Sequence, residues 1–199
     1  GKLYWRPNLL LYGRREGVPA VFVSKLAEDL NHFGRHHLIG TDFDSIVHHW
    51  ATEGLNYYAL SRLLWDPSLP AGTIMDDYCR SGFGAAAAPV KAWFSRIESI
   101  TDQVAARGSD KLEPYSTDVC AELNALLDEA NHLAGDDPLL RRRIEFLRSG
   151  IRFAAVQART HAFAAAYQNR TAAPDVRARF QTDMETKFRL MRRTFREEP

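Results

Sequence analysis

Polar and aromatic side chains are densest in one stretch of the chain, residues 41 to 58. Asp42 and Asp44 stand two residues apart there, and His48 and Trp50 follow them. In a β-strand alternate residues point to the same side, which would place the two carboxylates in one space with their backbones ~7 Å apart. Carboxylates so placed can bind sugar hydroxyls, hold a metal ion or transfer protons. The indole of Trp50, with an apolar face and a polar N–H edge, suits stacking against a sugar ring.

Each of these residues also has a simpler interpretation. Either carboxylate can instead cap the following helix or pair with Arg6 or Arg35. Trp50 can be an ordinary core residue. The neighbours His48 and His49 cannot both point the same way from one regular element, and no spaced histidine pair or matching cysteine accompanies them. We therefore expect neither a metal ion nor a cofactor.

Other signals of chemistry are missing from the sequence. The glycines of Gly82-Phe83-Gly84 lack the rest of a nucleotide-binding loop. No serine lies in a nucleophile-elbow sequence. Neither Cys79 nor Cys120 has an evident activating partner. The arginines of the last helix alternate with apolar residues, which is most simply a solvated face.

The composition is that of an ordinary globular chain. Of 199 residues, 45% are hydrophobic, and 26 basic residues balance 25 acidic ones to a net charge of +1. We therefore expect no nucleic-acid partner, and no apolar run approaches the ~20 residues that would cross a membrane. The two cysteines fit a reducing compartment, so a cytoplasmic location is favoured over a secreted one. Because the first residue is not methionine, we expect a piece of a longer protein.

The elements that must position the chemical residues begin with a strand, a helix and a second strand. The short apolar stretches at 2–5 and 8–12 predict strand and loop. Apolar residues at three- and four-residue steps between Pro19 and Gly34 predict a helix. Residues 38–44 predict a second strand that ends in acidic residues. A parallel pair joined by a crossover helix is the economical arrangement.

The rest of the chain is predicted to be helical. Apolar stripes predict helices over 55–64, 74–83, 90–104, 119–133, 144–165 and 176–195. Ser116 or Thr117 and Asp137 are the expected N-terminal caps of two of them. Residues 108–116 are the best candidate for an exposed linker or long loop. We expect 67–199 to form a helical bundle or layer, in which small alanines allow a neighbouring helix to approach closely.

The passage from Trp50 to Pro67, WATEGLNYYALSRLLWDP, resembles one found in bacterial glycoside-hydrolase-like proteins. These proteins are described largely as a domain of unknown function and are distantly related to the alpha-glucuronidases. Residues 77–86, DYCRSGFGAA, look like the next helix of that family. Upstream, Arg6-Pro7-Asn8, Gly17-Val18-Pro19 and Gly40-Thr41-Asp42-Phe43-Asp44 stand in family-like order. The resemblance covers about the first half of the chain, and the remainder only by its helical character.

The resemblance implies a mostly α fold in two parts. Residues 1–66 would be the last two β/α units of a (β/α)8 TIM-type barrel, and 67–199 an α-helical C-terminal domain. Two strands cannot close a barrel, so the remainder would come from a missing upstream segment or a second chain. The sugar-facing rim would be lined by Arg6, Asn8, Asp42, Asp44, His48 and Trp50. Packing and capping between the two parts would fall to Asn56, Tyr57, Arg62, Trp65 and Asp66.

The function implied by the resemblance is hydrolysis of O-glycosyl bonds by the full-length parent. Its two catalytic carboxyl groups would lie upstream, so this chain would bind part of a carbohydrate, hold no catalytic residue and be inactive alone. The helical part would supply stability or homodimer contacts. A hypothesis from another class is a self-contained helical protein-interaction module without enzymatic activity. It predicts Trp50 sealed in a helical core, whereas the sugar hypothesis predicts Trp50 open beside a parallel strand pair.

Overall fold

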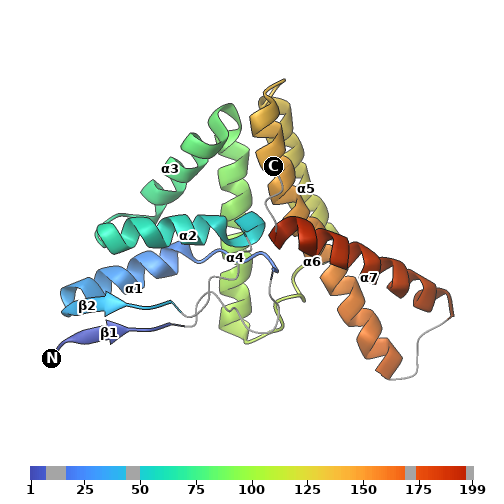
Figure 1. Ribbon diagram of the computed structural model, residues 1–199, viewed down its shortest axis with the longest axis horizontal. Helices are drawn as coiled ribbons and strands as arrows, with labels where there is room; N and C mark the ends of the chain where they lie inside the picture. Colours follow the sequence, from blue (N-terminus) through green and yellow to red (C-terminus); the bar gives the residue numbers. More distant parts are fainter. Residues whose placement is uncertain (8–16, 44–49, 169–173, 196–199) are drawn as a thin grey trace.

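The computed structural model describes residues 1–7, 17–43, 50–168 and 174–195. Its elements follow in the order β1 (Leu3–Trp5), α1 (Val23–Arg35), β2 (Leu38–Thr41), α2 (Trp50–Trp65), α3 (Ala71–Phe83), the 3-10 turn η2 (Gly84–Ala86), α4 (Ala87–Arg107), α5 (Thr117–Leu133), α6 (Pro138–Gln168) and α7 (Pro174–Phe195). The described chain is therefore mostly helical, as predicted, with one strand–helix–strand unit at its start (Figure 1).

The two strands pair in parallel, which confirms the predicted pair joined by a helix. Tyr4 pairs with Gly40 and Trp5 with Thr41. The second strand ends at Thr41, earlier than expected, so Asp42 follows the strand instead of lying within it. A barrel origin for this unit stays a prediction, because a parallel pair with a crossover helix occurs in several α/β folds.

The two faces of this small sheet differ. On one face Trp5 packs against Phe33 of α1, with ring centroids 5.0 Å apart. On the other face Tyr4 and Ile39 are 58% and 62% exposed. Parallel sheets are normally covered on both faces. Among the described residues, the face that carries Tyr4 and Ile39 is exposed and so departs from that rule.

Residues 17–22, which precede α1, are buried and form no regular element. The sequence predicts that the helix begins at the proline in this segment, but it begins at Val23. The backbone of the segment bonds to a core side chain instead. Phe22 N donates to Asn56 Oδ1 at 3.1 Å, and Asn56 Nδ2 donates to Ala20 O at 2.7 Å. The hydrogen-bond partner of this backbone, Asn56, comes from α2, 34 and 36 residues further along the chain. No local sequence pattern therefore predicts the structure of the segment.

The first half of α2 lies within the core, and the helix contacts α1, α3 and α6. Its residues 51–57 are all buried. A helix surrounded on nearly every side loses the alternation of polar and apolar faces that marks a surface helix. For this reason the periodicity predicted a helix only from residue 55, whereas α2 begins at Trp50.

One hydrophobic cluster runs through the described residues from Val18 to Ala154. Among its most deeply buried side chains are Leu26, Leu55, Trp93 and Phe94. The cluster contains residues from both sides of the predicted boundary between 66 and 67, and the division into 1–66 and 67–199 stays a prediction.

Two predicted helix caps are confirmed. Ser116 Oγ accepts a hydrogen bond from Val119 N at 3.3 Å at the start of α5. Asp137 Oδ1 accepts from Leu139 N at 2.8 Å and from Leu140 N at 3.1 Å at the start of α6. These bonds satisfy backbone N–H groups that the first helical turn leaves without partners inside the helix.

The segment 108–116 is a loop that is exposed in part, as the sequence predicts, but two of its side chains are buried. Leu112 and Tyr115 are 4% and 3% exposed, and the Tyr115 hydroxyl donates to the carbonyl oxygen of Pro19 at 2.5 Å. A long-range bond between buried groups therefore anchors the loop to the segment before α1.

Helix α6 contacts α5 and α2, and only its C-terminal part and the start of α7 extend together away from the other helices (Figure 1). The apolar stripe predicted for α6 is confirmed near its start, where Ile144, Leu147 and Ile151 are buried. Arg159 joins the two helices through a two-pronged ion pair with Asp183, at 3.0 and 2.9 Å. Within the described ranges, no helix combines the length and the apolar character needed to cross a membrane.

Candidate functional site

The carboxyl ends of β1 and β2 bring together two of the predicted site residues. Arg6 follows β1 and Asp42 follows β2, and Arg6 Nε lies 3.4 Å from Asp42 Oδ2. The strand ends are tied by Thr41 Oγ1 and Asp42 N, which donate to Trp5 O at 2.7 and 3.2 Å. The ion pair between Arg6 and Asp42 was the simpler of the two interpretations of Asp42, and both side chains remain about half exposed.

Three other predicted site residues, Asn8, Asp44 and His48, lie outside the described residues. The expectation that Asp42 and Asp44 share one space therefore stays a prediction. Among the described residues, no group of three histidine, cysteine, aspartate or glutamate side chains is arranged to hold a metal ion.

Trp50 opens α2 and is 41% exposed. It is not sealed in a helical core, contrary to the simpler interpretation. Its ring meets the ring of Tyr57 edge to face, with centroids 4.8 Å apart and planes at 73°. A Cβ added at Gly54 would lie 3.7 Å from Trp50 Cε3, so the indole lies over Gly54, one helical turn further along α2. The helix surface and Tyr57 therefore support an indole that is open to solvent on part of its surface.

About one helical turn along α2 from Trp50 lies a carboxylate that sequence reasoning missed. Glu53 is 2% exposed, and its Oε2 accepts a hydrogen bond from the Tyr57 hydroxyl at 2.7 Å. Glu53 belongs to the first turn of α2, where the helix dipole favours a negative charge. Burying a carboxylate costs free energy unless it is hydrogen-bonded or paired. The hydrogen bond from Tyr57 offsets part of that cost.

A spacing pattern could have revealed this group. Trp50, Glu53 and Tyr57 stand at positions i, i+3 and i+7, which places them on one face of a helix. The apolar periodicity predicts a helix only from residue 55, so it does not place Trp50 and Glu53 on a helix face. We call these three residues the Trp50 cluster.

A second polar group begins at Tyr58, the residue after Tyr57, and lies between α2 and α3. The Tyr58 hydroxyl donates to Asp77 Oδ2, and Arg62 Nη1 lies 3.6 Å from the same carboxylate oxygen. The hydrogen bond from Tyr58 lowers the pKa of Asp77, and the same bond raises the pKa of Tyr58. Because its members join two helices, we interpret this group as structural.

The packing and capping residues implied by the resemblance divide into correct and incorrect predictions. Asn56 is fully buried and Tyr57 is 7% exposed. The hydrogen bonds of Asn56 go to residues 20 and 22 of the same predicted part, so packing between the two parts stays a prediction for both. Asp66 Oδ1 accepts from Ser68 N at 3.0 Å and caps the turn after α2. The prediction for Trp65 is wrong, because its side chain is 93% exposed.

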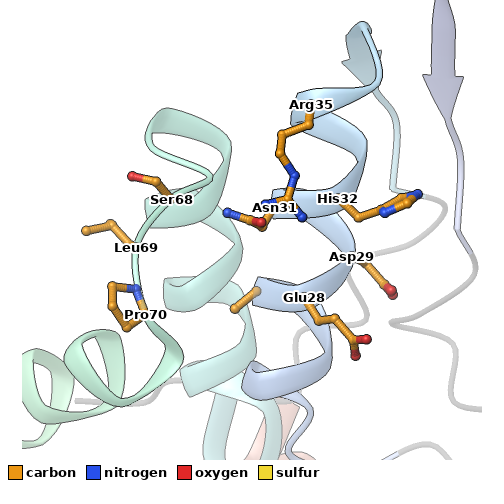
Figure 2. Close-up of a pocket in the computed structure, with 9 residues that line it drawn as sticks. Glu28, Asp29, Asn31, His32, Arg35, Ser68, Leu69 and Pro70 are labelled. Carbon is orange, nitrogen blue, oxygen red and sulfur yellow. The ribbon is translucent and has the colours of Figure 1, made fainter.

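A surface pocket of about 400 Å³ lies away from these residues. Figure 2 shows that α1 lines one side and the loop between α2 and α3 lines the other. Its lining mixes Glu28, Asp29, His32 and Arg35 with the shorter side chains of the loop. None of the predicted site residues lines this pocket, and its charges of both signs favour no single ligand class.

A family model described as a domain of unknown function (DUF4838) matches residues 8–95. The matched segment contains Asp42 and the whole Trp50 cluster, and its description carries no activity. The match agrees with the expected resemblance to a domain of unknown function over the first half of the chain. No curated protein and no solved structure matches the chain.

Proposed function

We propose that this chain is the C-terminal portion of a carbohydrate-active, glycoside-hydrolase-like protein and contributes one side of its sugar-binding pocket. The observation that supports this most is Trp50, a partly exposed indole at the start of the helix that follows β2. In α/β folds, ligand-contacting groups collect at the carboxyl ends of parallel strands and in the loops that follow them. Arg6 and Asp42 stand at those strand ends.

In this proposal the chain binds sugar and does not carry out the reaction. An indole presents a flat apolar face to the C–H groups of a sugar ring, while its N–H edge can bind a hydroxyl. Asp42 accepts hydrogen bonds from hydroxyl groups and Arg6 donates them. Cleavage of a glycosidic bond needs two carboxyl groups on either side of it, and these would belong to another part of the parent protein.

The proposal also requires a partner for the sheet. Tyr4 and Ile39 leave one sheet face exposed, and a single pair of strands is marginal as an independent sheet. Further parallel strands, from the same protein or from a second chain, would cover that face and complete the pocket.

A helical interaction module without enzymatic activity is the second candidate. It is favoured by Trp65 and Leu64 at the end of α2, which are 93% and 45% exposed. Large exposed apolar side chains that lie together often mark a protein contact. The exposure of Trp50, which this hypothesis predicts to be buried, favours the sugar hypothesis.

The two tryptophans at the ends of α2 provide a matched test. The 199-residue chain is titrated with cellotetraose, xylotetraose and an aldouronic trisaccharide, and binding is followed by saturation-transfer NMR. We expect one of these probes to bind and Trp50→Ala to weaken binding at least about tenfold, equal to about 1.4 kcal/mol. Trp65→Ala should leave the affinity unchanged. Absence of binding to every probe, or equal losses in the two variants, would overturn the proposal.

A further inference from the structure

The Trp50 cluster connects a buried carboxyl group to an exposed ring through one intermediate side chain. Glu53 is 2% exposed, Tyr57 is 7% exposed and Trp50 is 41% exposed. Glu53 Oε2 accepts a hydrogen bond from the Tyr57 hydroxyl at 2.7 Å. The Tyr57 ring meets the indole edge to face, with ring centroids 4.8 Å apart. The three side chains therefore form a continuous path from the core to the surface.

We propose that Glu53 and Tyr57 are positioning residues that hold the Trp50 indole in a ligand-ready orientation. A tyrosine side chain has two rotatable bonds, and anchoring its hydroxyl leaves the ring little freedom. The anchor is strong because its acceptor is a carboxylate in a buried setting. The fixed ring then limits the orientations of the indole that packs edge to face against it.

An indole fixed in this way binds a flat ligand better than a mobile one. Immobilising a side chain on binding costs conformational entropy, and a ring that is already held avoids that cost. That the ligand is a sugar rests on the proposed function. The positioning of the indole does not, because it is a property of the protein without ligand.

The neighbouring tyrosine offers a close chemical comparison. Tyr58 also donates its hydroxyl to a carboxylate, that of Asp77, but its ring lies against Tyr78 of α3, with centroids 5.3 Å apart. Tyr57→Phe and Tyr58→Phe each remove one hydroxyl from one tyrosine of the same helix. A change that follows only Tyr57→Phe cannot come from a general loss of tyrosine hydroxyls.

The test follows the Trp50 ring directly. The chain is labelled with 5-fluorotryptophan, and the signal of Trp50 among the four tryptophans is identified in ¹⁹F NMR spectra by its loss in Trp50→Phe. In the free protein, Tyr57→Phe should shift and broaden the Trp50 signal and leave the Trp65 signal in place. Tyr58→Phe should leave the Trp50 signal as in the wild type.

A second variant covers the case in which Tyr57→Phe does not fold. Glu53→Gln keeps an acceptor oxygen of similar position but removes the charge, so it should move the Trp50 signal in the same direction by a smaller amount. If a folded Tyr57→Phe protein, or in its place Glu53→Gln, leaves the signal unchanged, the inference is wrong. It is equally wrong if Tyr58→Phe moves the signal as far as Tyr57→Phe does.

Binding of the oligosaccharide that the wild type recognises gives the second measurement. Tyr57→Phe should weaken it about threefold to tenfold, because the indole must then be ordered on binding. If the wild type binds no oligosaccharide but Tyr57→Phe changes the Trp50 signal, the proposed function is wrong and the positioning of the indole stands. Binding to the wild type with no response of the signal refutes the positioning alone.

Discussion

Gly150 of α6 lies directly against Thr52 of α2: a Cβ at position 150 would lie 2.6 Å from Thr52 Cγ2 and 3.4 Å from the carbonyl oxygen of Ala51. Contacts shorter than 3.0 Å between such atoms force something to move. The absence of a side chain at this one position therefore sets how closely α6 approaches the first turn of α2, which carries Trp50 and Glu53.

The first prediction concerns that contact. Gly150→Ala should lower the free energy of unfolding by about 1–3 kcal/mol, because overpacking outweighs the helix propensity that alanine adds. Urea unfolding measures it. Gly82→Ala in α3 is the matched control, because a Cβ there meets nothing within 4 Å; it should be neutral or stabilising by up to about 1 kcal/mol.

Thr52→Ser tests the same contact from the other helix. It removes Cγ2 and keeps the hydroxyl, so Gly150→Ala should cost less in a Thr52→Ser background than in the wild type. A double-mutant cycle measures the difference. Equal costs in both backgrounds would mean that the clash is not with Thr52.

The second prediction concerns Asn56, whose side chain holds the backbone of the segment before α1. Asn56→Ala leaves the buried N–H of Phe22 and the carbonyl of Ala20 without these partners and should cost about 2–4 kcal/mol in urea unfolding. Asn31 is the control, because it is only partly buried and donates one longer bond, 3.3 Å, to Pro67 O. Asn31→Ala should cost less than about 1 kcal/mol, and an equal cost for both variants would contradict the role of Asn56.

The third prediction concerns pH. The hydrogen bond from Tyr58 lowers the pKa of Asp77 in the folded protein. The stabilisation from this carboxylate is therefore complete above the unfolded pKa of about 3.9, and it is lost as the pH falls through the lower folded pKa. Wild type should be more stable than Asp77→Asn near neutral pH, and the difference should shrink on acidification.

Urea unfolding at about pH 6 and about pH 3 measures this difference. In a Tyr58→Phe background the effect of Asp77→Asn should be smaller at the higher pH, because the main cause of the pKa shift has been removed. A difference that stays constant with pH would show that the carboxylate charge is not what stabilises the contact.

The fourth prediction concerns the two thiols. Cys79 and Cys120 are 1% and 8% exposed, and burial raises the pKa of both, that of Cys79 to about 12. A thiol that is both covered and protonated is a poor nucleophile. Both cysteines should react with Ellman's reagent at once in urea and only slowly in the native protein. Rapid reaction of either thiol in the native protein would contradict its burial.

Much of the fold was predictable from the sequence, because the signals involved are local. Apolar spacing marks α1, α4 and α5, and capping chemistry at Ser116 and Asp137 depends only on residues two or three positions away. The order strand, helix, strand and the parallel pairing follow from the same kind of evidence.

The candidate site was predictable only in part. Residue type selected Asp42 and Trp50, since these side chains can bind polar or flat ligands in almost any setting, and the family resemblance added Arg6. Tertiary structure decided which of them meet, how far Trp50 is open, and that Glu53 is buried where it bonds to Tyr57. It also decided that Trp65 is exposed while Tyr115 of the loop is buried. The physical reason is that burial and long-range hydrogen bonds depend on which elements pack together, and α2, surrounded on most sides, carries no periodic pattern that records its neighbours.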